Sequence, residues 1–174
     1  MDINKISIGK NAPEEINVII EIPSGTGPVK YEFDKDSGAI FVDRFLSTAM
    51  FYPANYGFIP HTLSDDGDPA DVLVITEQAV IAGSVISARP IGVLIMEDEK
   101  GMDEKIIAVP NSKIDPNSTN IKELEDLPKA KLEQISHFFE RYKDLEKGKW
   151  AKIQGFENKA KAIEIIQSSI KNAS

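Results

Sequence analysis

The sequence predicts an α+β fold in which a closed or strongly curved, mainly antiparallel β-barrel precedes two helices. Short apolar runs with alternating polarity recur along the chain up to Asp115, as strands require. Beyond Asp115 apolar residues recur at steps of three and four, which is the helical period. Strands first and helices last is an order typical of α+β proteins.

At least six segments are predicted as strands, bounded by Gly, Pro and charged turns. They are Asn17–Ile22, Val29–Phe33, Ile40–Phe45, Val72–Ile75, Val85–Ile95 and Ile106–Val109. In the first strand Glu21 shares a face with Ile19, which is unusual for a solvent-facing acid. In the longest strand Gly92 predicts a bend or bulge, and Arg89-Pro90 favours an edge or a bulge.

Two amphipathic helices are predicted in the C-terminal part of the chain. The first is marked by Leu132, Ile135, Phe139 and Tyr142 and is expected to end at Gly148. The second spans Glu157–Ile170. There is no internal repeat and no linker to a second domain, so residues 1–174 are expected to form a single domain.

Composition argues against several classes of function. The formal net charge is -8 and the pI about 4.8, which disfavours nucleic acid or an anionic membrane as the main partner. The chain has no cysteine, which excludes disulfides, a thiolate zinc site and a cysteine nucleophile. No apolar run has the length of a signal peptide or a membrane span, so a cytoplasmic location is expected.

The segment Asp65–Asp71 concentrates four carboxylates within seven residues, interrupted by Gly67 and Pro69. Such a loop is commonly a solvated acidic turn, but crowded carboxylates also suit a hard cation such as Mg²⁺. A calcium loop counted from Asp66 fails, because alanine and aspartate occupy its fifth and sixth positions, where a ligand and a glycine are required. The sequence therefore leaves a solvated turn and a magnesium site open.

A second acidic loop, 97–105, reads by itself as a solvated hairpin tip. Together with the first loop it offers further metal ligands and a lysine for phosphate. Cations and phenols elsewhere have simple structural interpretations, yet they could also bind an anion. The full candidate set is Glu21, Lys30, Glu32, Arg44, Tyr52, Tyr56, Asp66, Asp68, Asp71, Asp98, Asp103, Lys105, Tyr142 and Lys143.

This mixture of carboxylates with lysines, an arginine and tyrosines would bind a small, highly charged phosphate compound chelated by metal. Carboxylates could hold two or more Mg²⁺ ions that lower the pKa of a shared water. Lysine and arginine would neutralise the charge on the departing phosphate. Such chemistry requires no covalent intermediate. The two histidines, His61 and His137, are expected to be structural.

The segment 66–72, Asp-Gly-Asp-Pro-Ala-Asp-Val, resembles the signature of the soluble family I inorganic pyrophosphatases. The resemblance extends over nearly the whole chain. It is supported by 21–23, 30–32, 51–60, 98–99, 103–110 and 137–143. Ala70 is smaller than the aliphatic residue usual at its position in the family, which concerns packing rather than chemistry.

The resemblance implies a single catalytic domain over 1–174 that hydrolyses pyrophosphate to two orthophosphates with several Mg²⁺ ions per site. Mn²⁺ or Zn²⁺ could substitute for Mg²⁺. The implied fold is an OB-like five-stranded antiparallel β-barrel with flanking strands and two C-terminal helices. The implied mechanism is direct attack by a water or hydroxide that bridges two metals.

The resemblance also assigns a role to each candidate residue. Asp66, Asp71, Asp98 and Asp103 look like metal ligands, with Glu21 and Glu32 acting through water. Asp68 looks like the general base, and Lys30, Arg44 and Tyr56 also count as catalytic. The phosphate-binding set is Lys30, Glu32, Arg44, Tyr52, Tyr56, Lys105, Tyr142 and Lys143.

The family resemblance further implies a homohexamer, in which the helix of His137 would form contacts. Arg141 stands where some relatives have a second histidine, which leaves the strength of that assembly open. Three other functions compete with the pyrophosphatase interpretation: a catalytically idle Mg²⁺ or Ca²⁺ module, an OB-type nucleic-acid binder and a broader phosphohydrolase. The first does not need the cations, and the acidic net charge disfavours the second.

Overall fold

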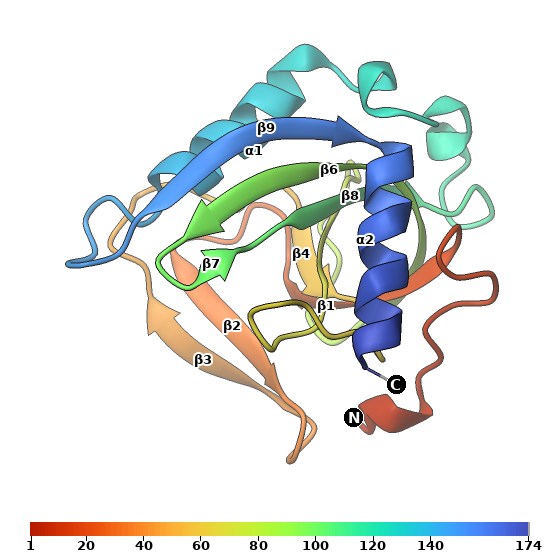
Figure 1. Ribbon diagram of the computed structural model, residues 1–174, viewed down its shortest axis with the longest axis horizontal. Coiled ribbons are helices and arrows are strands. Elements are labelled where there is room, and N and C mark those ends of the chain that lie inside the picture. Colours follow the sequence, from red (N-terminus) through yellow and green to blue (C-terminus); the bar gives the residue numbers. More distant parts are fainter. Residues whose placement is uncertain (174) are drawn as a thin grey trace.

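A five-stranded barrel forms the centre of the protein, whose computed structural model describes residues 1–173 (Figure 1). Its strands pair in the order β1-β4-β5-β8-β6, and β6 returns to β1 to close the ring. Their bounds are β1 Ile16–Ile22, β4 Asn55–Phe58, β5 Asp71–Val74, β6 Val85–Asp98 and β8 Lys105–Pro110. This confirms the OB-like α+β prediction, except that β5 and β8 run parallel.

Other elements are added around this barrel. Strand β9 and the short β7 both pair with β6, and β2 with β3 forms a separate two-stranded sheet. Their bounds are β2 Val29–Asp34, β3 Ala39–Phe45, β7 Gly101–Met102 and β9 Ala151–Asn158. The helices are α1 Lys129–Arg141 and α2 Lys159–Asn172, with 3₁₀ turns at Ile3–Lys5, Pro116–Asn120 and Leu124–Asp126.

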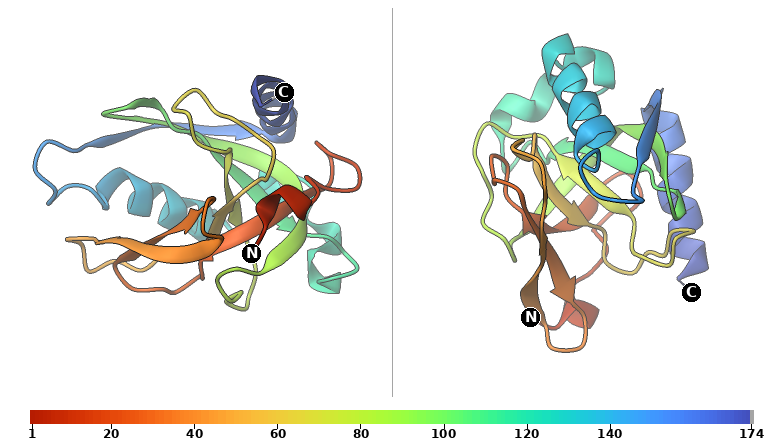
Figure 2. Two further views of the ribbon diagram at one scale, coloured as in Figure 1. Left: turned by 90° about the horizontal axis from the view of Figure 1, so that it is seen from below. Right: turned by 90° about the vertical axis from the view of Figure 1, so that its left-hand side faces the viewer.

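Alternating residues of the barrel strands contribute to two apolar cores. Leu73 of β5 and Ile107 of β8 belong to the core that α1 covers, where Phe138 is buried. Val72 and Ile106 belong to the core that α2 covers. Each fully buried aliphatic side chain contributes roughly 1.5–3 kcal/mol. The two helices accordingly lie on different sides of the barrel (Figure 2).

Close backbone approaches fix the pairing of the barrel strands. A Cβ on Gly57 of β4 would lie 2.0 Å from the carbonyl oxygen of Ile19 in β1. In β6 the pairing with β8 shifts register between Pro90 and Gly92, which confirms the predicted bulge. A Cβ on Gly92 would lie 2.3 Å from Cγ of Leu124. Both positions therefore need glycine for space.

Three details of the predicted elements are wrong. Strand β9 was not expected, so the strands do not all precede the helices. It lies partly exposed along β6, and Gly155 at φ 135° interrupts its alternation, which hid it in the sequence. Helix α1 ends at Arg141 rather than at Gly148, which lies at φ 78°. Strand β4 lies within the turn-rich segment 51–60, where aromatic residues and prolines masked it.

The β2–β3 hairpin extends away from the barrel toward the N-terminal segment (Figure 1). Phe33 packs with Ile19 and Phe58 of the barrel, and Ile3 and Ile6 pack against this group. Since the hairpin shares no sheet with the barrel, side-chain contacts hold it in place. Within residues 1–173, no helix is long and apolar enough to cross a membrane.

We predict that Gly92→Ala lowers the free energy of unfolding by about 1–3 kcal/mol, because its methyl group would overpack against Leu124. Urea unfolding followed by circular dichroism measures the change. Gly27→Ala is the control, since its Cβ would meet only Cε1 of Phe51 at 3.8 Å. Equal stabilities of the two variants would contradict the packing assigned to Gly92.

Candidate active site

A cavity of about 380 Å³ opens at one end of the barrel, between the β2–β3 hairpin, the acidic loop 64–70 and the segment after α1. Every candidate residue from the sequence lines it except Tyr52. Residues from distant parts of the chain, between Glu21 and Lys149, are therefore brought together. The lining also includes Phe33, Lys35, Phe58, Pro69, Glu99, Lys100 and Lys149.

Tyr52 is not among the lining residues, although the charges of Arg44, Lys105, Asp71 and Glu21 act on its hydroxyl. It is 4% exposed, and its ring centroid lies 6.0 Å from that of Tyr56 and 4.8 Å from that of Phe138. Burial raises the pKa of both tyrosine hydroxyls, so each stays protonated at neutral pH. Tyr52 thus supports Tyr56 by packing, while Tyr56 itself faces the cavity.

Lys105 forms the most buried charged group of the site. It pairs in register with Asp71 across the parallel strands β8 and β5, and its ammonium contacts the carboxylates of Asp71 and Asp103. Burial alone would lower the pKa of Lys105, but these two charges raise it. Burial raises the pKa of Asp71, and repulsion from Asp103 adds to this while Lys105 opposes it. The single ammonium of Lys105 therefore partly neutralises two carboxylates.

Lys143 makes a similar contact at the other side of the cavity. Its Nζ lies 2.6 Å from Asp98 Oδ2 at the end of β6 and 3.2 Å from Glu99 Oε2. Although burial opposes ionisation, Lys143 and a backbone N–H hold the pKa of Asp98 below its usual value. Lys143 lies two residues beyond the end of α1 at Arg141.

The hairpin supplies charges from the third side. Lys30 of β2 contacts Glu32 on the same strand face, as their spacing predicts, and lies 3.5 Å from Asp43 Oδ2. Arg44 Nη1 lies 2.6 Å from the same carboxylate. A bulge places Asp43 between the paired positions of Val42 and Arg44, and this brings its carboxylate to both cations.

Glu21 is a buried acid in the wall of the cavity. It lies at a bulge of β1 opposite Tyr56, is 8% exposed, and accepts a 2.7 Å hydrogen bond from the Phe33 N–H. Burial raises its pKa to about 8, and the negative charge of Asp71 adds to the effect. Glu21, which shares a strand face with Ile19 in the sequence pattern, thus faces the cavity rather than bulk solvent.

The acidic loop presents two carboxylates with different surroundings. Asp66 Oδ1 accepts a 3.0 Å hydrogen bond from the Asp68 N–H, and Gly67 at φ 88° permits the turn. Burial raises the pKa of Asp66. The Asp68 carboxylate has no hydrogen-bond or ion-pair partner among residues 1–173. It is therefore available to a molecule in the cavity.

The donor chemistry of the cavity fits a hard divalent cation. Carboxylate oxygens are the ligands that Mg²⁺ prefers. Burial raises the pKa of Glu21, Asp66 and Asp71, and a bound cation would favour their ionised forms. In the described part of the chain, no three His, Cys, Asp or Glu side chains are already grouped to hold a metal ion. Instead, Lys105 and Lys143 lie among the acids.

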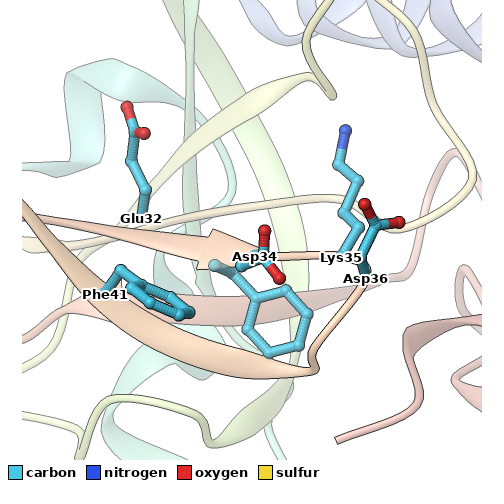
Figure 3. Close-up of a pocket in the computed structure, with 6 residues that line it drawn as sticks. Glu32, Asp34, Lys35, Asp36 and Phe41 are labelled. Carbon is cyan, nitrogen blue, oxygen red and sulfur yellow. The ribbon is translucent and has the colours of Figure 1, made fainter.

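A neighbouring cavity of about 400 Å³ lies along the hairpin and is lined by 32–36 and Phe41. It shares Glu32, Phe33 and Lys35 with the larger cavity. Glu32 and Lys35 extend to the same side of the hairpin, away from Phe41 (Figure 3). Because the two cavities share these residues, the second is an extension of the first. Among the candidate residues, only Glu32 lines it.

Sequence reasoning missed several residues at the cavity. Lys35, Lys100 and Lys149 all lie in or beside turns between strands or after α1, where charged residues normally indicate solvent. Glu146 lies within ion-pair distance of Arg44 and Lys149. The only signal for these residues was their nearness to the matched segments, since the contacts depend on the fold.

Three comparisons agree on the relationships of this chain. Residues 18–174 match the sequence model of a family described as inorganic pyrophosphatase. The inorganic pyrophosphatase of Rickettsia felis is 63% identical over 174 residues, covering 100% of both chains.

Solved structures give the same result. An inorganic phosphatase from Anaplasma phagocytophilum matches with a TM-score of 0.95 at 53% identity, covering 97% of this chain and 99% of the other. The inorganic pyrophosphatase of Helicobacter pylori matches with a TM-score of 0.93 at 53% identity, covering 97% and 98%. Since the whole chain is covered at high identity, it is an enzyme of the inorganic pyrophosphatase family.

Proposed function

We propose that the protein hydrolyses inorganic pyrophosphate to two orthophosphates in the presence of Mg²⁺, by direct attack of water and without a covalent intermediate. The observation that carries this proposal is the single cavity that gathers carboxylates, lysines, an arginine and tyrosines. Membership of the family supports pyrophosphate as the substrate. A metal-binding module without activity would not need the cations at the cavity.

The proposed cation ligands are Asp66, Asp71, Asp98 and Asp103, with Glu21 and Glu32 acting through water. When bound there, Mg²⁺ ions would activate water and offset phosphate charge; Mn²⁺ or Zn²⁺ could replace them. The carboxylates of Asp71 and Asp103 share Lys105, so added positive charge would relieve their repulsion. The lysines, the arginine and the tyrosines of the cavity would bind and orient the substrate.

Binding of the anion is proposed for residues on opposite walls. Lys30 and Arg44 come from the hairpin, while Lys105 and Lys143 come from the barrel and from the segment after α1. These cations would neutralise the charge that develops on the departing phosphate. The phenols of Tyr56 and Tyr142 complete the set as hydrogen-bond donors. Burial raises the pKa of both hydroxyls, so they stay protonated at neutral pH.

Asp68 is the proposed general base. Its carboxylate lines the cavity and has no partner among residues 1–173, so it can accept the proton of the attacking water. The carboxylates of Asp71, Asp98 and Asp103 are engaged by Lys105 or Lys143 and are less available for this step. Asp68 would then return the proton to solvent or to the product.

Assembly and location remain proposals as well. We expect a homohexamer in the cytoplasm, and His137 is exposed on α1, as a contact residue would be in an isolated chain. The acidic net charge of -8 argues against nucleic acid as a partner.

The function is tested by phosphate release from pyrophosphate, ATP and a phosphomonoester, with Mg²⁺ and with chelator. We expect rapid release from pyrophosphate only, and only with Mg²⁺. Comparable release from ATP would show a broader phosphohydrolase. No release with any divalent ion would refute the proposal and leave a folded metal-binding relative.

We predict that Asp68→Asn lowers kcat by about 10²–10⁴-fold, because it removes the proposed base. Its Tm and its affinity for Mg²⁺, measured by calorimetry, should match those of the wild type. Asp65→Asn is the matched control, since Asp65 lies in the same loop but does not line the cavity. A near-wild-type kcat for Asp68→Asn would remove the base role from Asp68.

We predict that Glu21→Gln raises the free energy of unfolding of the metal-free protein by roughly 3–5 kcal/mol above pH 8. In the unfolded chain the carboxyl loses its proton near pH 4.5, while in the folded protein it keeps it up to about pH 8. Stability therefore falls between these values as pH rises, and glutamine avoids this loss. At pH 4 the two proteins should be equally stable.

Urea unfolding across this pH range measures the difference, with exposed Glu133→Gln on α1 as control. Saturating Mg²⁺ should narrow the gap, because a bound cation favours the ionised carboxylate. Parallel curves for wild type and Glu21→Gln would show that Glu21 ionises normally in the fold.

A further inference from the structure

Arg44 lies between two carboxylates that come from different parts of the chain. Asp43 Oδ2, beside it in β3, lies 2.6 Å from Nη1, and Glu146 Oε2 lies 3.3 Å from Nε. Glu146 belongs to the segment between α1 and β9. Its side chain is 12% exposed. Burial would lower the pKa of Arg44, but Glu146 and then Asp43 raise it, so the guanidinium stays charged.

These contacts use two edges of the planar guanidinium. In the described chain, Nη2 donates no hydrogen bond, and Arg44 lines the cavity. Phosphate is recognised most effectively by a guanidinium whose plane is fixed in advance. Carboxylates on two edges fix that plane and leave one nitrogen for an anion.

Glu146 also joins two walls of the cavity. The hairpin that carries Lys30 and Arg44 forms a separate sheet, and the segment after α1 carries Lys143. Glu146 Oε2 contacts Arg44 on one side and lies 2.7 Å from Lys149 Nζ on the other. Besides apolar packing, this carboxylate thus connects the two walls that hold the proposed phosphate-binding cations.

The contact between Glu146 and Arg44 is not a completed hydrogen bond. Glu146 Oε1 and Arg44 Nε are both buried without a hydrogen-bond partner. The two groups therefore interact by charge rather than through a hydrogen bond, so the contact depends on the negative charge of Glu146.

We propose that Glu146 is a positioning residue that orients Arg44 toward the phosphate-binding cavity. The inference rests on the proposed function, in which Arg44 binds a phosphate group. Glu146 itself does not line the cavity, so it acts through Arg44. It fixes the guanidinium plane from the edge opposite to Asp43.

The test is a double-mutant cycle of Glu146→Gln and Arg44→Ala in the full chain. Glu146→Gln keeps the shape and an acceptor but removes the charge. It should lower kcat/KM for pyrophosphate about tenfold, mainly through KM, without changing Tm. On the Arg44→Ala background the same change should have less than about a twofold effect. Glu164→Gln, an exposed glutamate of α2, is the matched control and should behave as wild type.

Equal losses from Glu146→Gln with and without Arg44 would overturn the proposal, as would a wild-type kcat/KM for the single variant. Should Glu146→Gln fold poorly, Glu146→Asp tests the same contact, because the shorter side chain keeps the charge but draws it away from Arg44 Nε. It should also lower kcat/KM on the wild-type background but not on the Arg44→Ala background, and a wild-type kcat/KM would count against the proposal.

Calorimetric binding of inorganic phosphate separates this inference from the proposed function. Glu146→Gln should weaken phosphate binding only where Arg44 is present, whether or not the protein turns over pyrophosphate. An inactive wild type with this dependence would refute the function and keep the positioning role. If the wild type is active but Glu146→Gln weakens phosphate binding equally with and without Arg44, the proposed function stands and the positioning role is refuted.

Discussion

Repulsion among buried carboxylates is the constraint on which the site depends. Asp71 and Asp103 share the ammonium of Lys105, and Asp98 depends on Lys143. Removing one partner from such a buried pair typically costs about 3–5 kcal/mol, because the remaining charge stays desolvated. In the metal-free protein both lysines therefore stabilise this concentration of acids. The same repulsion among carboxylates makes the cavity suited to bind cations.

Strands position Asp71, Asp98 and Lys105, whereas Asp103 and Lys143 lie in connecting segments. Parallel pairing sets Asp71 beside Lys105 at the start of β5 and β8, and a one-residue slip would turn either side chain to the other face. Bulges in β1 and β3 aim Glu21 and bring Asp43 to the cations. The bulges thus occur where a side chain at the cavity has to be turned out of the regular strand pattern.

Much of the fold and most of the candidate site could be predicted from the sequence. Apolar alternation located six strands, and Gly92 revealed its bulge, because both signals are local. The matched segments named the residues that the cavity gathers. Their chemical roles stay predictions.

What the sequence could not show depends on contacts between distant segments. The closure of β6 onto β1, the parallel pair and the partners of Lys105 are set by strand order and register. Strand β9 was hidden because its exposed residues and Gly155 break the apolar pattern. Neighbouring tyrosines gave no sign that Tyr56 lines the cavity and that Tyr52 does not.

The close approach at Gly57 affects how a mutational survey of this enzyme would read. Any side chain there would push β4 from β1, and with it Tyr56 from Glu21. Activity would fall although Gly57 has no chemical group to contribute. A map of inactivating substitutions would therefore mark this glycine beside the true binding residues, and only a parallel map of protein abundance would separate spacing from chemistry.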